Sequence, residues 1–546
     1  MKPGFKIGFI LLVSLAISCA TIVTPSGGPN DTLPPKVTAC QPSNYSINFV
    51  ADEVQISFDE YIKIKDITTN LIVSPPLLEK PEISVKGKSI VVKFLEELHP
   101  NSTYTLNFGD AIRDITEDNV LTNFQYVFST GSFIDSLQVR GAVQDAFSKE
   151  NSVDVLVLLY ACNDWDDCDS LPYKQRPSYY TITNKAGQFV IQNVKDGSYL
   201  LFALKDANRN FIYDLPNESI GFVNHVIDAG DSISYDLSLF EEEGGQKLLR
   251  FKSKQKGRID LSFQHPVQKL RVNPMKGGGK KAWEVIEYSS ERDSLIYWNN
   301  IGADTIELRL YDEVSGFKDT VRIGQGKEYP NVLSIVSNIK DNSFHDINKA
   351  IQLRLSAPVQ APKLNRFVLL KQIDSVHFDT VKMEILFKDP AMRSIDITHD
   401  FLESTVYQLF IPAKCMQDMF GNFNDSLSVP FSIRPLSFYG NAKIDVEFPN
   451  ANNSYLVQLY NARKKIIRES FIIPDTAVTN MSQVLEYQYL SPGTYGVRVI
   501  EDVNGNLKWD SGKFLSKELP EKVFYYPESI TIRSNWDVVL DWEVDK

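Results

Sequence analysis

Two stretches of the chain, residues 206–214 and 502–510, repeat one pattern of oxygen-bearing side chains, Asp-x-Asn-x-Asn-x-x-x-Asp. The residues that carry the pattern are Asp206, Asn208, Asn210 and Asp214 in the first copy and Asp502, Asn504, Asn506 and Asp510 in the second. Oxygens at positions 1, 3, 5 and 9 form the first half of a calcium loop such as the EF-hand. The spacing therefore makes calcium a candidate cofactor at both loops.

The same pattern also suits a structural turn. Asn and Asp side chains cap turns by accepting hydrogen bonds from nearby backbone N–H groups, and Tyr213 and Trp509 would then pack on a domain edge. The bidentate Glu that closes an EF-hand at position 12 is missing from both copies, although Glu218 follows the first at position 13. Both interpretations stay open, and both can hold at once, because extracellular modules bind calcium only at about 10⁻⁴–10⁻³ M.

Each loop ends a longer repeat. Residues 196–214 align without a gap with residues 492–510, and residues 101–130 resemble residues 404–433 in a second repeat. Residues 245–330 match neither type. The chain is therefore expected to contain two kinds of unit in the order A–B, an intervening segment, then A′–B′.

Almost every segment of the chain has the composition of a β-strand. Short runs such as VQISF, TYTLNF and IELRLY are rich in β-branched or aromatic residues and often alternate, whereas no stretch has a sustained helical period. We therefore predict an all-β fold, a tandem array of about five Ig-like or transthyretin-like β-sandwiches. The expected domains are residues 32–131, 134–240, 245–330, 331–436 and 437–546.

The first residues form a separate segment. Lys2 and Lys6 precede eleven apolar residues, too few to span a bilayer, which predicts a signal peptide over residues 1–18. Cys19 follows a small residue, as in a bacterial lipobox, and we predict its lipidation; an ordinary cleaved signal is the alternative. Residues 19–31 would then be a lipid-anchored tether, continuing into a stretch rich in Pro and Gly.

The remaining cysteines and acidic residues suggest further sites. Cys162 and Cys168 bracket the segment CNDWDDC, where an exported protein could close a disulfide loop; two free thiols are the alternative. No CxxC pair supports a zinc site. The acidic residues of this loop are a second calcium candidate or a solvated segment; they are Asp164, Asp166, Asp167 and Asp169.

No catalytic motif emerges from the sequence. The six histidines are scattered without an HExxH pair, GxSxG is absent, and residues 275–282 lack the spacing of a phosphate-binding loop. The net charge of −12 argues against a nucleic-acid partner. We therefore expect a protein that is not an enzyme.

Several phrases resemble known domain families. DTLPPKVTAC, VQISFDEYIKI, LHPNSTYTLNF and FQYVFSTG look like an SbsA-type bacterial Ig-like domain, and residues 331–436 look like a divergent second copy. VRGAVQDA and NKAGQFVIQNVKDGSYLLFALKD are similar to carboxypeptidase-regulatory or transthyretin-like domains, which are non-catalytic, and residues 437–546 match them more weakly. The whole arrangement resembles lipoproteins of Bacteroidota. That resemblance implies a lipid anchor in the outer membrane, on a face that the sequence leaves open.

These observations lead to one functional expectation and one alternative. The expected function is a non-enzymatic, lipid-anchored scaffold that binds other envelope proteins through strand edges or loops, and that could assist an envelope assembly machine. The alternative is a glycan-binding or nutrient-acquisition lipoprotein, for which a cluster of exposed tryptophans on one face would be the sign. The six tryptophans are Trp165, Trp283, Trp298, Trp509, Trp536 and Trp542.

Overall fold

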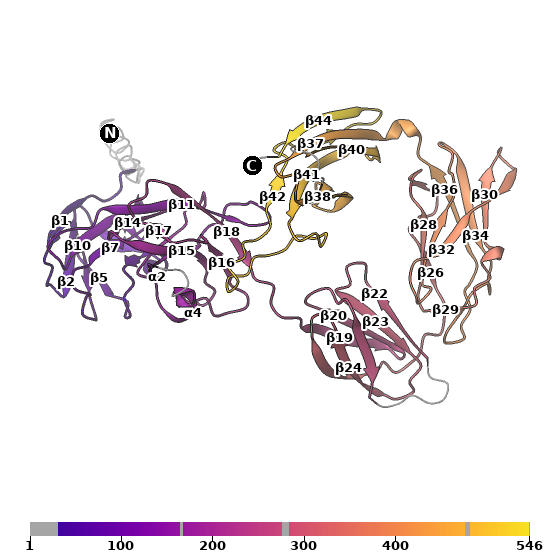
Figure 1. The fold of residues 1–546 in the computed structure, drawn as a ribbon, viewed down its shortest axis with the longest axis horizontal. Coiled ribbons are helices and arrows are strands. Elements are labelled where there is room, and N and C mark those ends of the chain that lie inside the picture. The colour runs from indigo at the N-terminus through magenta and orange to yellow at the C-terminus, as the bar shows by residue number, and fades with distance from the viewer. Residues whose placement is uncertain (1–30, 164–167, 276–282, 475–480, 545–546) are drawn as a thin grey trace, which may run out of the picture. The chain divides into compact units, whose positions relative to one another are not determined.

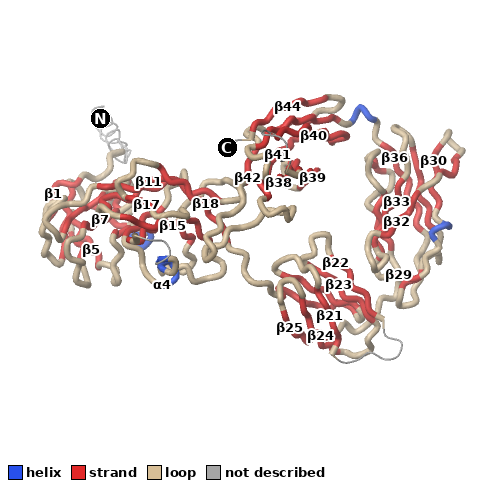
Figure 2. The backbone as a smooth tube through the Cα atoms, in the orientation of Figure 1, coloured by secondary structure: helices blue, strands red, loops and turns tan. Residues whose placement is uncertain are grey.

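A computed structural model describes residues 31–163, 168–275, 283–474 and 481–544. These residues are almost all in strands and loops (Figures 1 and 2). They form two compact units: one holds the residues up to Glu242 together with Gly512–Pro520, and the other holds Glu243–Ser511 together with the residues from Glu521 onward. Within the described ranges, no helix is long and apolar enough to cross a membrane. The expectation of an all-β tandem array of β-sandwiches is confirmed.

The first unit begins with a sandwich of three small sheets, in the orders β1-β2-β6-β5, β10-β7-β4 and β3-β8-β9. Its elements are β1 (Val37–Gln41), β2 (Glu53–Phe58), β3 (Ile62–Ile64), α2 (Ile67–Asn70), β4 (Ile72–Ser74), β5 (Glu82–Lys86), β6 (Ser89–Lys93), β7 (Thr103–Asn107), β8 (Ile112–Asp114), β9 (Val120–Leu121) and β10 (Gln125–Ser129). Buried aromatic residues such as Tyr104, Phe108 and Phe128 fill the space between the sheets.

The second sandwich forms one continuous path, β13-β12-β15-β16-β18-β11-β14, with β17 paired to β15. Its elements are β11 (Leu137–Asp145), β12 (Leu156–Ala161), α4 (Leu171–Lys174), β13 (Tyr179–Ile182), β14 (Gln188–Val194), β15 (Ser198–Lys205), β16 (Ser219–Phe222), β17 (Ile227–Asp228) and β18 (Ser234–Glu241). Direct hydrogen bonds join it to the first sandwich: the Tyr180 hydroxyl accepts from the Val73 N–H at 3.2 Å, and Ser74 Oγ accepts from the Tyr180 N–H at 3.1 Å.

The second unit opens with a sandwich of sheets β19-β20-β23-β22 and β21-β24-β25. Its strands are β19 (Leu248–Gln255), β20 (Arg258–Phe263), β21 (Leu270–Pro274), β22 (Glu284–Tyr288), β23 (Ser294–Asn299), β24 (Thr305–Asp312) and β25 (Lys318–Gly324). One end of the first sheet's outer face packs on the next sandwich, because fully buried Trp298 belongs to that sandwich's hydrophobic core.

The fourth sandwich has sheets β26-β28-β33-β32, β27-β36-β34-β30-β31 and β29-β35. Its elements are β26 (Ile335–Ser337), β27 (Ser343–His345), β28 (Ile351–Leu355), β29 (Val359–Gln360), η1 (Leu364–Arg366), β30 (Val368–Gln372), β31 (Phe378–Val381), β32 (Glu384–Phe387), β33 (Ser394–Thr398), β34 (Val406–Ile411), β35 (Gln417–Asp418) and β36 (Leu427–Ile433). The antiparallel pairing of β26, β28, β33 and β32 matches that of β1, β2, β6 and β5 in the first sandwich.

The fifth sandwich repeats most of the strand pairing of the second. After η2 (Leu436–Phe438) come β37 (Gly440–Phe448), β38 (Ser454–Asn461), β39 (Ile466–Ile472), β40 (Met481–Leu490), β41 (Gly493–Asp502), β42 (Val523–Tyr525), β43 (Ile530–Ile532) and β44 (Asp537–Glu543). Strand β37 pairs antiparallel with β40 and parallel with β44, as β11 pairs with β14 and β18. The repeat expected from residues 196–214 and 492–510 thus extends to most of the strand pairing. The difference is that β16 pairs with β18 in the second sandwich, whereas the described strands of the fifth form two separate sheets.

Side-chain alternation accounts for these strands. Along β37, Ala442, Ile444 and Val446 are buried, whereas the charged residues between them are exposed. This period of two places every second residue in the core of a sandwich.

Candidate functional site

The first repeated loop, which follows β15, is closed by its own polar side chains. The Asp206 carboxylate accepts hydrogen bonds from two backbone N–H groups of the loop at 2.6 and 2.7 Å. The side-chain amides of Asn208 and Asn210 donate to Asp214 at 3.1 and 2.9 Å. All four residues of the pattern therefore lie together and fix the turn.

The second loop, which follows β41, has the same network. Asp502 accepts from two backbone N–H groups at 3.0 and 2.8 Å. Asn504 donates to Asp510 at 2.5 Å, and Asn506 donates to the same carboxylate. These are the hydrogen bonds that the turn interpretation requires.

A glutamate that stands just ahead of the following strand braces each loop. Glu218, which is 1% exposed, accepts from the N–H groups of Ala207, Asp214 and Leu215 at 3.0–3.1 Å. In the second copy Glu521 accepts from the corresponding N–H groups at the start and end of the loop, at 2.8 and 3.0 Å.

Sequence reasoning assigned such a residue only to the first copy, and Glu521 was missed. Glu521 comes eleven residues after Asp510, whereas Glu218 comes four residues after Asp214. The available signal was its position just ahead of β42, since Glu218 likewise stands just ahead of β16.

The metal interpretation of the loops stays a prediction. Across the part of the chain that the structure describes, no three His, Cys, Asp or Glu side chains gather as metal ligands. Calcium at either loop would therefore draw on asparagine oxygens and backbone carbonyls as well as carboxylates. Of the second calcium candidate, Asp164, Asp166 and Asp167 lie outside the described residues, as does the predicted lipidation site Cys19.

The second loop also carries an ion pair. Lys508 Nζ lies 2.9 Å from Asp510 Oδ1 and 3.8 Å from Glu243. Partial burial by itself would raise the pKa of Asp510, but hydrogen bonds from Lys508 and the two asparagines outweigh it and lower that pKa below 3.8. Burial, together with the nearby Asp510 and Asp502, raises the pKa of Glu521.

The segment between Asp510 and Glu521 contains a hairpin that belongs to the first unit. The backbones of Lys513 and Glu518 exchange hydrogen bonds of 2.8 and 2.9 Å. At its tip Phe514 is 1% exposed, and its ring centroid lies 5.4–5.5 Å from those of Tyr173, Phe202 and Phe222.

Glu242 holds this aromatic cluster by two polar contacts. It accepts from the Phe514 N–H at 2.5 Å and from the Tyr213 hydroxyl at 2.9 Å. Burial and the Glu242 carboxylate both raise the pKa of Tyr213. The aromatic residue just before the first loop's final Asp thus packs on the domain edge, as expected.

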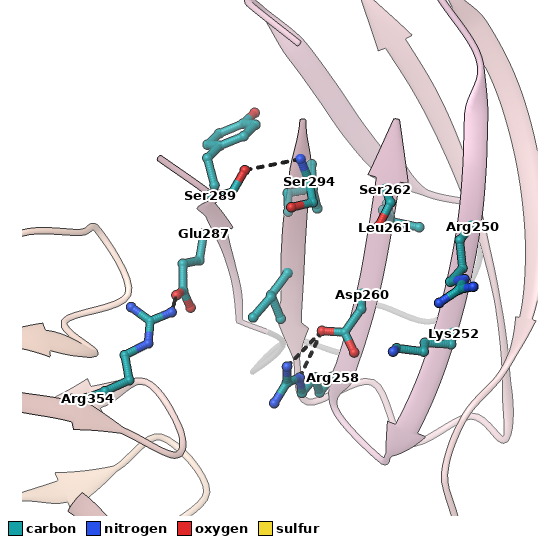
Figure 3. Close-up of a pocket in the computed structure, with 13 residues that line it drawn as sticks. Arg250, Lys252, Arg258, Asp260, Leu261, Ser262, Glu287, Ser289, Ser294 and Arg354 are labelled. Atoms are coloured by element: carbon teal, nitrogen blue, oxygen red, sulfur yellow. Dashed lines mark hydrogen bonds and ion pairs between the residues drawn. The ribbon is translucent and has the colours of Figure 1, made fainter. Parts of the chain in front are cut away.

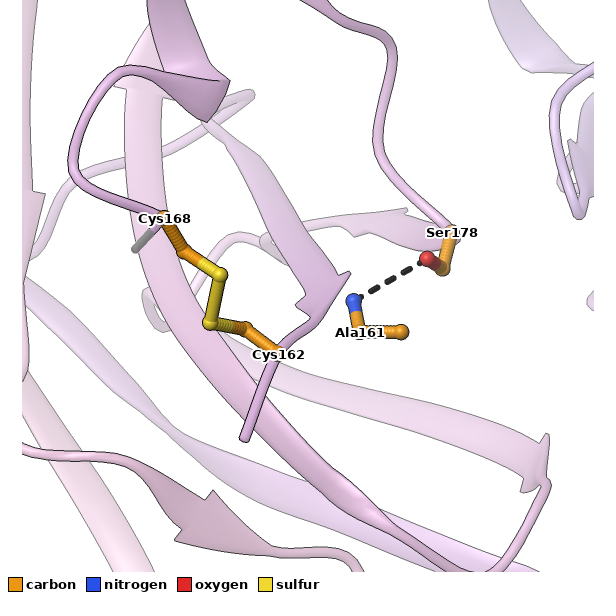
Figure 4. Close-up of a disulfide and its surroundings, with 4 residues drawn as sticks. All are labelled: Ala161, Cys162, Cys168 and Ser178. Atoms are coloured by element: carbon orange, nitrogen blue, oxygen red, sulfur yellow. Dashed lines mark hydrogen bonds between the residues drawn. A yellow bond between two sulfur atoms is a disulfide. The ribbon is translucent and has the colours of Figure 1, made fainter. Parts of the chain in front are cut away.

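Cys162 and Cys168 form a disulfide, with a Cα–Cα distance of 6.3 Å (Figure 4). It closes the start of the connection between β12 and β13, the segment that includes α4 and the Phe514 contact Tyr173. The other end of this connection is held by Ser178 Oγ, which accepts from the Ala161 N–H at 3.1 Å.

An open groove of about 350 Å³ lies on the outer face of the β19-β20-β23-β22 sheet (Figure 3). Ser262 of β20, Ser294 of β23 and Ser289, which follows β22, line it together with charged residues. Arg258 donates to Asp260 at 3.0 and 2.9 Å, and Arg354 of β28 pairs with Glu287. Arg250 and Lys252 of β19 lie on the same face but have no hydrogen-bond or ion-pair partner among the described residues.

Glu287 is the centre of the packing beside this groove. It is 2% exposed and accepts from Arg393 at 2.6 Å and from the Trp298 indole N–H at 3.1 Å. The Arg393 guanidinium lies over the Trp298 ring at 4.8 Å. Because a buried charge is costly unless it is paired, this cluster fixes how the third and fourth sandwiches pack.

The tryptophans do not form an exposed cluster within the described residues. Trp536 is 59% exposed, whereas Trp298 and Trp542 are buried and Trp283 and Trp509 are partly buried. Trp165 lies outside the described residues. The sign expected for a sugar-stacking surface is therefore missing from this part of the chain.

Comparison with known proteins identifies one domain. Residues 31–130 match the bacterial Ig-like domain family. This confirms the coarser part of the resemblance noted for residues 32–131. No curated protein matches the chain.

Solved structures that align with the chain share little sequence with it. The S-layer protein rSbsC(31-844) is 12% identical over 86% of this chain and 65% of its own, with a TM-score of 0.14. The major pilin subunit BcpA of Bacillus cereus is 11% identical over 76% of this chain and 100% of its own, with a TM-score of 0.14. Latent PorU from Porphyromonas gingivalis is 9% identical over 71% of this chain and 46% of its own, with a TM-score of 0.17. The chain thus spans about two thirds of the S-layer protein's length.

Proposed function

We propose that this protein is a non-enzymatic scaffold of the bacterial cell envelope, anchored in the outer membrane by a lipid on Cys19, that binds other envelope proteins through the edges of its sheets. The observation that carries the proposal is where the exposed apolar side chains lie. Many stand on strands at the edge of a sheet; they include Leu249 and Phe251 on β19, Val336 on β26, Phe344 on β27, Phe378 on β31, Leu386 on β32, Phe471 on β39 and Val539 on β44.

An edge strand has unpaired backbone N–H and C=O groups, which can accept a strand from another chain. Exposed apolar residues beside such an edge add the contact area that a partner strand would cover. A hairpin tip next to β31 extends this surface, since Ile373 is 53% and Val376 76% exposed. The bacterial Ig-like domain at residues 31–130 supports placing the protein in the envelope.

Affinity purification of the full-length protein from gently solubilised outer membranes, followed by mass spectrometry, tests this proposal. We expect stoichiometric recovery of an envelope protein, for instance of an assembly machine. Separate variants Phe251→Glu, Phe344→Glu and Phe378→Glu should identify the edge used, because one of them should lose the partner. Val50→Glu is the matched control, since Val50 is 97% exposed but lies outside any strand. Recovery of the protein alone would contradict the proposal.

Calcium at the two repeated loops forms a subsidiary part of the proposal. Each loop gathers two carboxylates, two asparagine amides and a bracing glutamate, and these supply the hard oxygen atoms that calcium prefers. In that role the ion would stiffen the loop rather than take part in chemistry.

A further inference from the structure

The edge strand β19 combines three features within a few residues. It is hydrogen-bonded only to β20, so its outer edge from Leu248 to Lys252 has no strand partner among the described residues. Leu249 is 64% and Phe251 46% exposed. Arg250 and Lys252, which alternate with them, are also exposed.

The charged and the apolar side chains of β19 face opposite ways along most of this edge. Arg250 pairs across the ladder with Ser262, and Lys252 with Asp260, so both lie on the groove face (Figure 3). Phe251 pairs with buried Leu261 and therefore lies on the core face, where its edge position leaves it exposed.

Charge favours one class of occupant. The other two cations of the groove are already paired, Arg258 with Asp260 and Arg354 with Glu287, which leaves Arg250 and Lys252 as its unpaired charges. A basic edge resists pairing with an identical edge of a second copy, because like charges would face each other. The same edge would attract a strand with carboxylates on its groove face.

We propose that β19 is the docking edge for a partner protein's β-strand in which acidic and apolar residues alternate. The strand would extend the sheet through backbone hydrogen bonds. Its acidic side chains would lie beside Arg250 and Lys252 and its apolar side chains beside Phe251. This proposal rests on the scaffold function and names the chemistry of one of its partners.

Fluorescence anisotropy of labelled peptides with the full chain tests the proposal. The probe is an eight-residue peptide of alternating Glu and Val, and the matched peptide alternates Lys and Val. We expect binding of the Glu peptide that weakens with added salt, and little binding of the Lys peptide. The variant Arg250→Glu/Lys252→Glu should weaken Glu-peptide binding at least tenfold and allow the Lys peptide to bind. Lys247→Glu/Lys269→Glu, which reverses two exposed charges of the same sandwich outside the groove, should leave both affinities unchanged.

Hydrogen exchange on the same complex separates strand pairing from mere charge attraction. Bound Glu peptide should slow exchange of the β19 amides that face the open edge. Unchanged exchange there, equal effects of the two charge reversals, or binding of a sulfated hexasaccharide in preference to the peptide would each overturn the proposal. An envelope partner recovered equally by wild type and by Arg250→Glu/Lys252→Glu would leave the scaffold function standing and remove β19 as its contact.

Discussion

The second and fifth sandwiches share most of their strand pairing and their capped loop, yet they differ in two connections. In the second, the connection from β12 to β13 spans residues 162–178 and holds the disulfide and α4, whereas β38 and β39 are joined by a short turn. In the fifth, the stretch between the loop and its bracing glutamate is longer and includes the 512–520 hairpin.

The two differences meet in one place. The hairpin of the later repeat belongs to the first unit, where Phe514 packs against Tyr173, a residue of the long connection in the earlier repeat. Most of the repeated framework is thus kept, while each copy varies in one loop, and these two loops contact each other through Tyr173 and Phe514. Loops between strands tolerate such insertions because their length costs little free energy.

Removal of the Phe514 ring should have the largest effect on this arrangement. Phe514→Ala would leave a cavity among Phe202, Phe222 and Tyr173, and should lower the free energy of unfolding of the first unit by about 3–5 kcal/mol. Urea denaturation, combined with hydrogen exchange of β15 and β16, measures this. Leu515→Ala is the control, because Leu515 is 73% exposed. Equal stability of the two variants would show that the hairpin contributes nothing to this core.

Substitution of the bracing glutamates should cause the next largest loss of stability. Glu218→Gln keeps the shape of the side chain but turns an amide N–H₂ toward a buried backbone donor, which should cost about 1–3 kcal/mol. Glu521→Gln should cost less, since Glu521 holds two backbone N–H groups and Glu218 holds three. Glu528→Gln, at an exposed position, serves as the control in the same denaturation series. A larger loss for Glu521→Gln than for Glu218→Gln would show that the number of backbone N–H groups held does not set the cost.

Loss of the disulfide tests the connection between β12 and β13. Cys162→Ser/Cys168→Ser should lower stability by about 2 kcal/mol, the value expected for so short a closed loop. Hydrogen exchange should become faster over Leu171–Lys174, because the disulfide restrains the chain ahead of α4. Cys40→Ser, which removes a free cysteine, should not change exchange there. Unchanged exchange in α4 would show that Tyr173 is held by its aromatic contacts alone.

Calcium should stabilise both loops weakly. If the dissociation constant is about 1 mM, then 10 mM calcium should add about 1.4 kcal/mol per loop. Thermal unfolding with calcium, with magnesium and with chelator measures this, and Asp214→Ala and Asp510→Ala should each remove one part of the gain. Identical unfolding curves in all three conditions would leave the loops as capped turns only.

The sequence predicted the strands well because alternation of buried and exposed residues decides them locally, as Ala442, Ile444 and Val446 illustrate. It also predicted the repeated loops, since the four Asp and Asn residues of each pattern lie within nine residues, but it missed Glu521, which lies eleven residues beyond Asp510. It did not predict the contacts of Phe514, because a hairpin residue gives no sign of which distant core receives it. The pairing of Glu287 with Arg393 was missed for the same reason, as these residues are 106 positions apart.

The smallest expected effect concerns the lysine that distinguishes the second loop from the first. Lys508 stands where the first copy has Ile212, so Lys508→Ile makes the two loops alike. The ion pair with Asp510 is partly exposed, and its loss should therefore cost only about 0.2–1 kcal/mol at pH 7.

The pH dependence of this ion pair's contribution to stability follows from the shifted pKa values of Asp510 and Lys508. Because the pKa of Asp510 is lowered in the folded protein, its contribution is present above pH 3.8 and is lost as the pH falls through the folded value. Partial burial alone would lower the pKa of Lys508, but contact with Asp510 and Glu243 outweighs burial and raises this pKa. The contribution of Lys508 to stability is therefore lost only as the pH rises past 10.5. Wild type and Lys508→Ile should therefore differ most between these limits and converge in acid. The measurement is the hydrogen exchange rate of the β41 amides as a function of pH. The control variant Lys522→Ile, at an exposed site, should not differ from wild type in these rates over that pH range. A difference that persists below pH 3 would mean that Lys508 acts by packing rather than by charge.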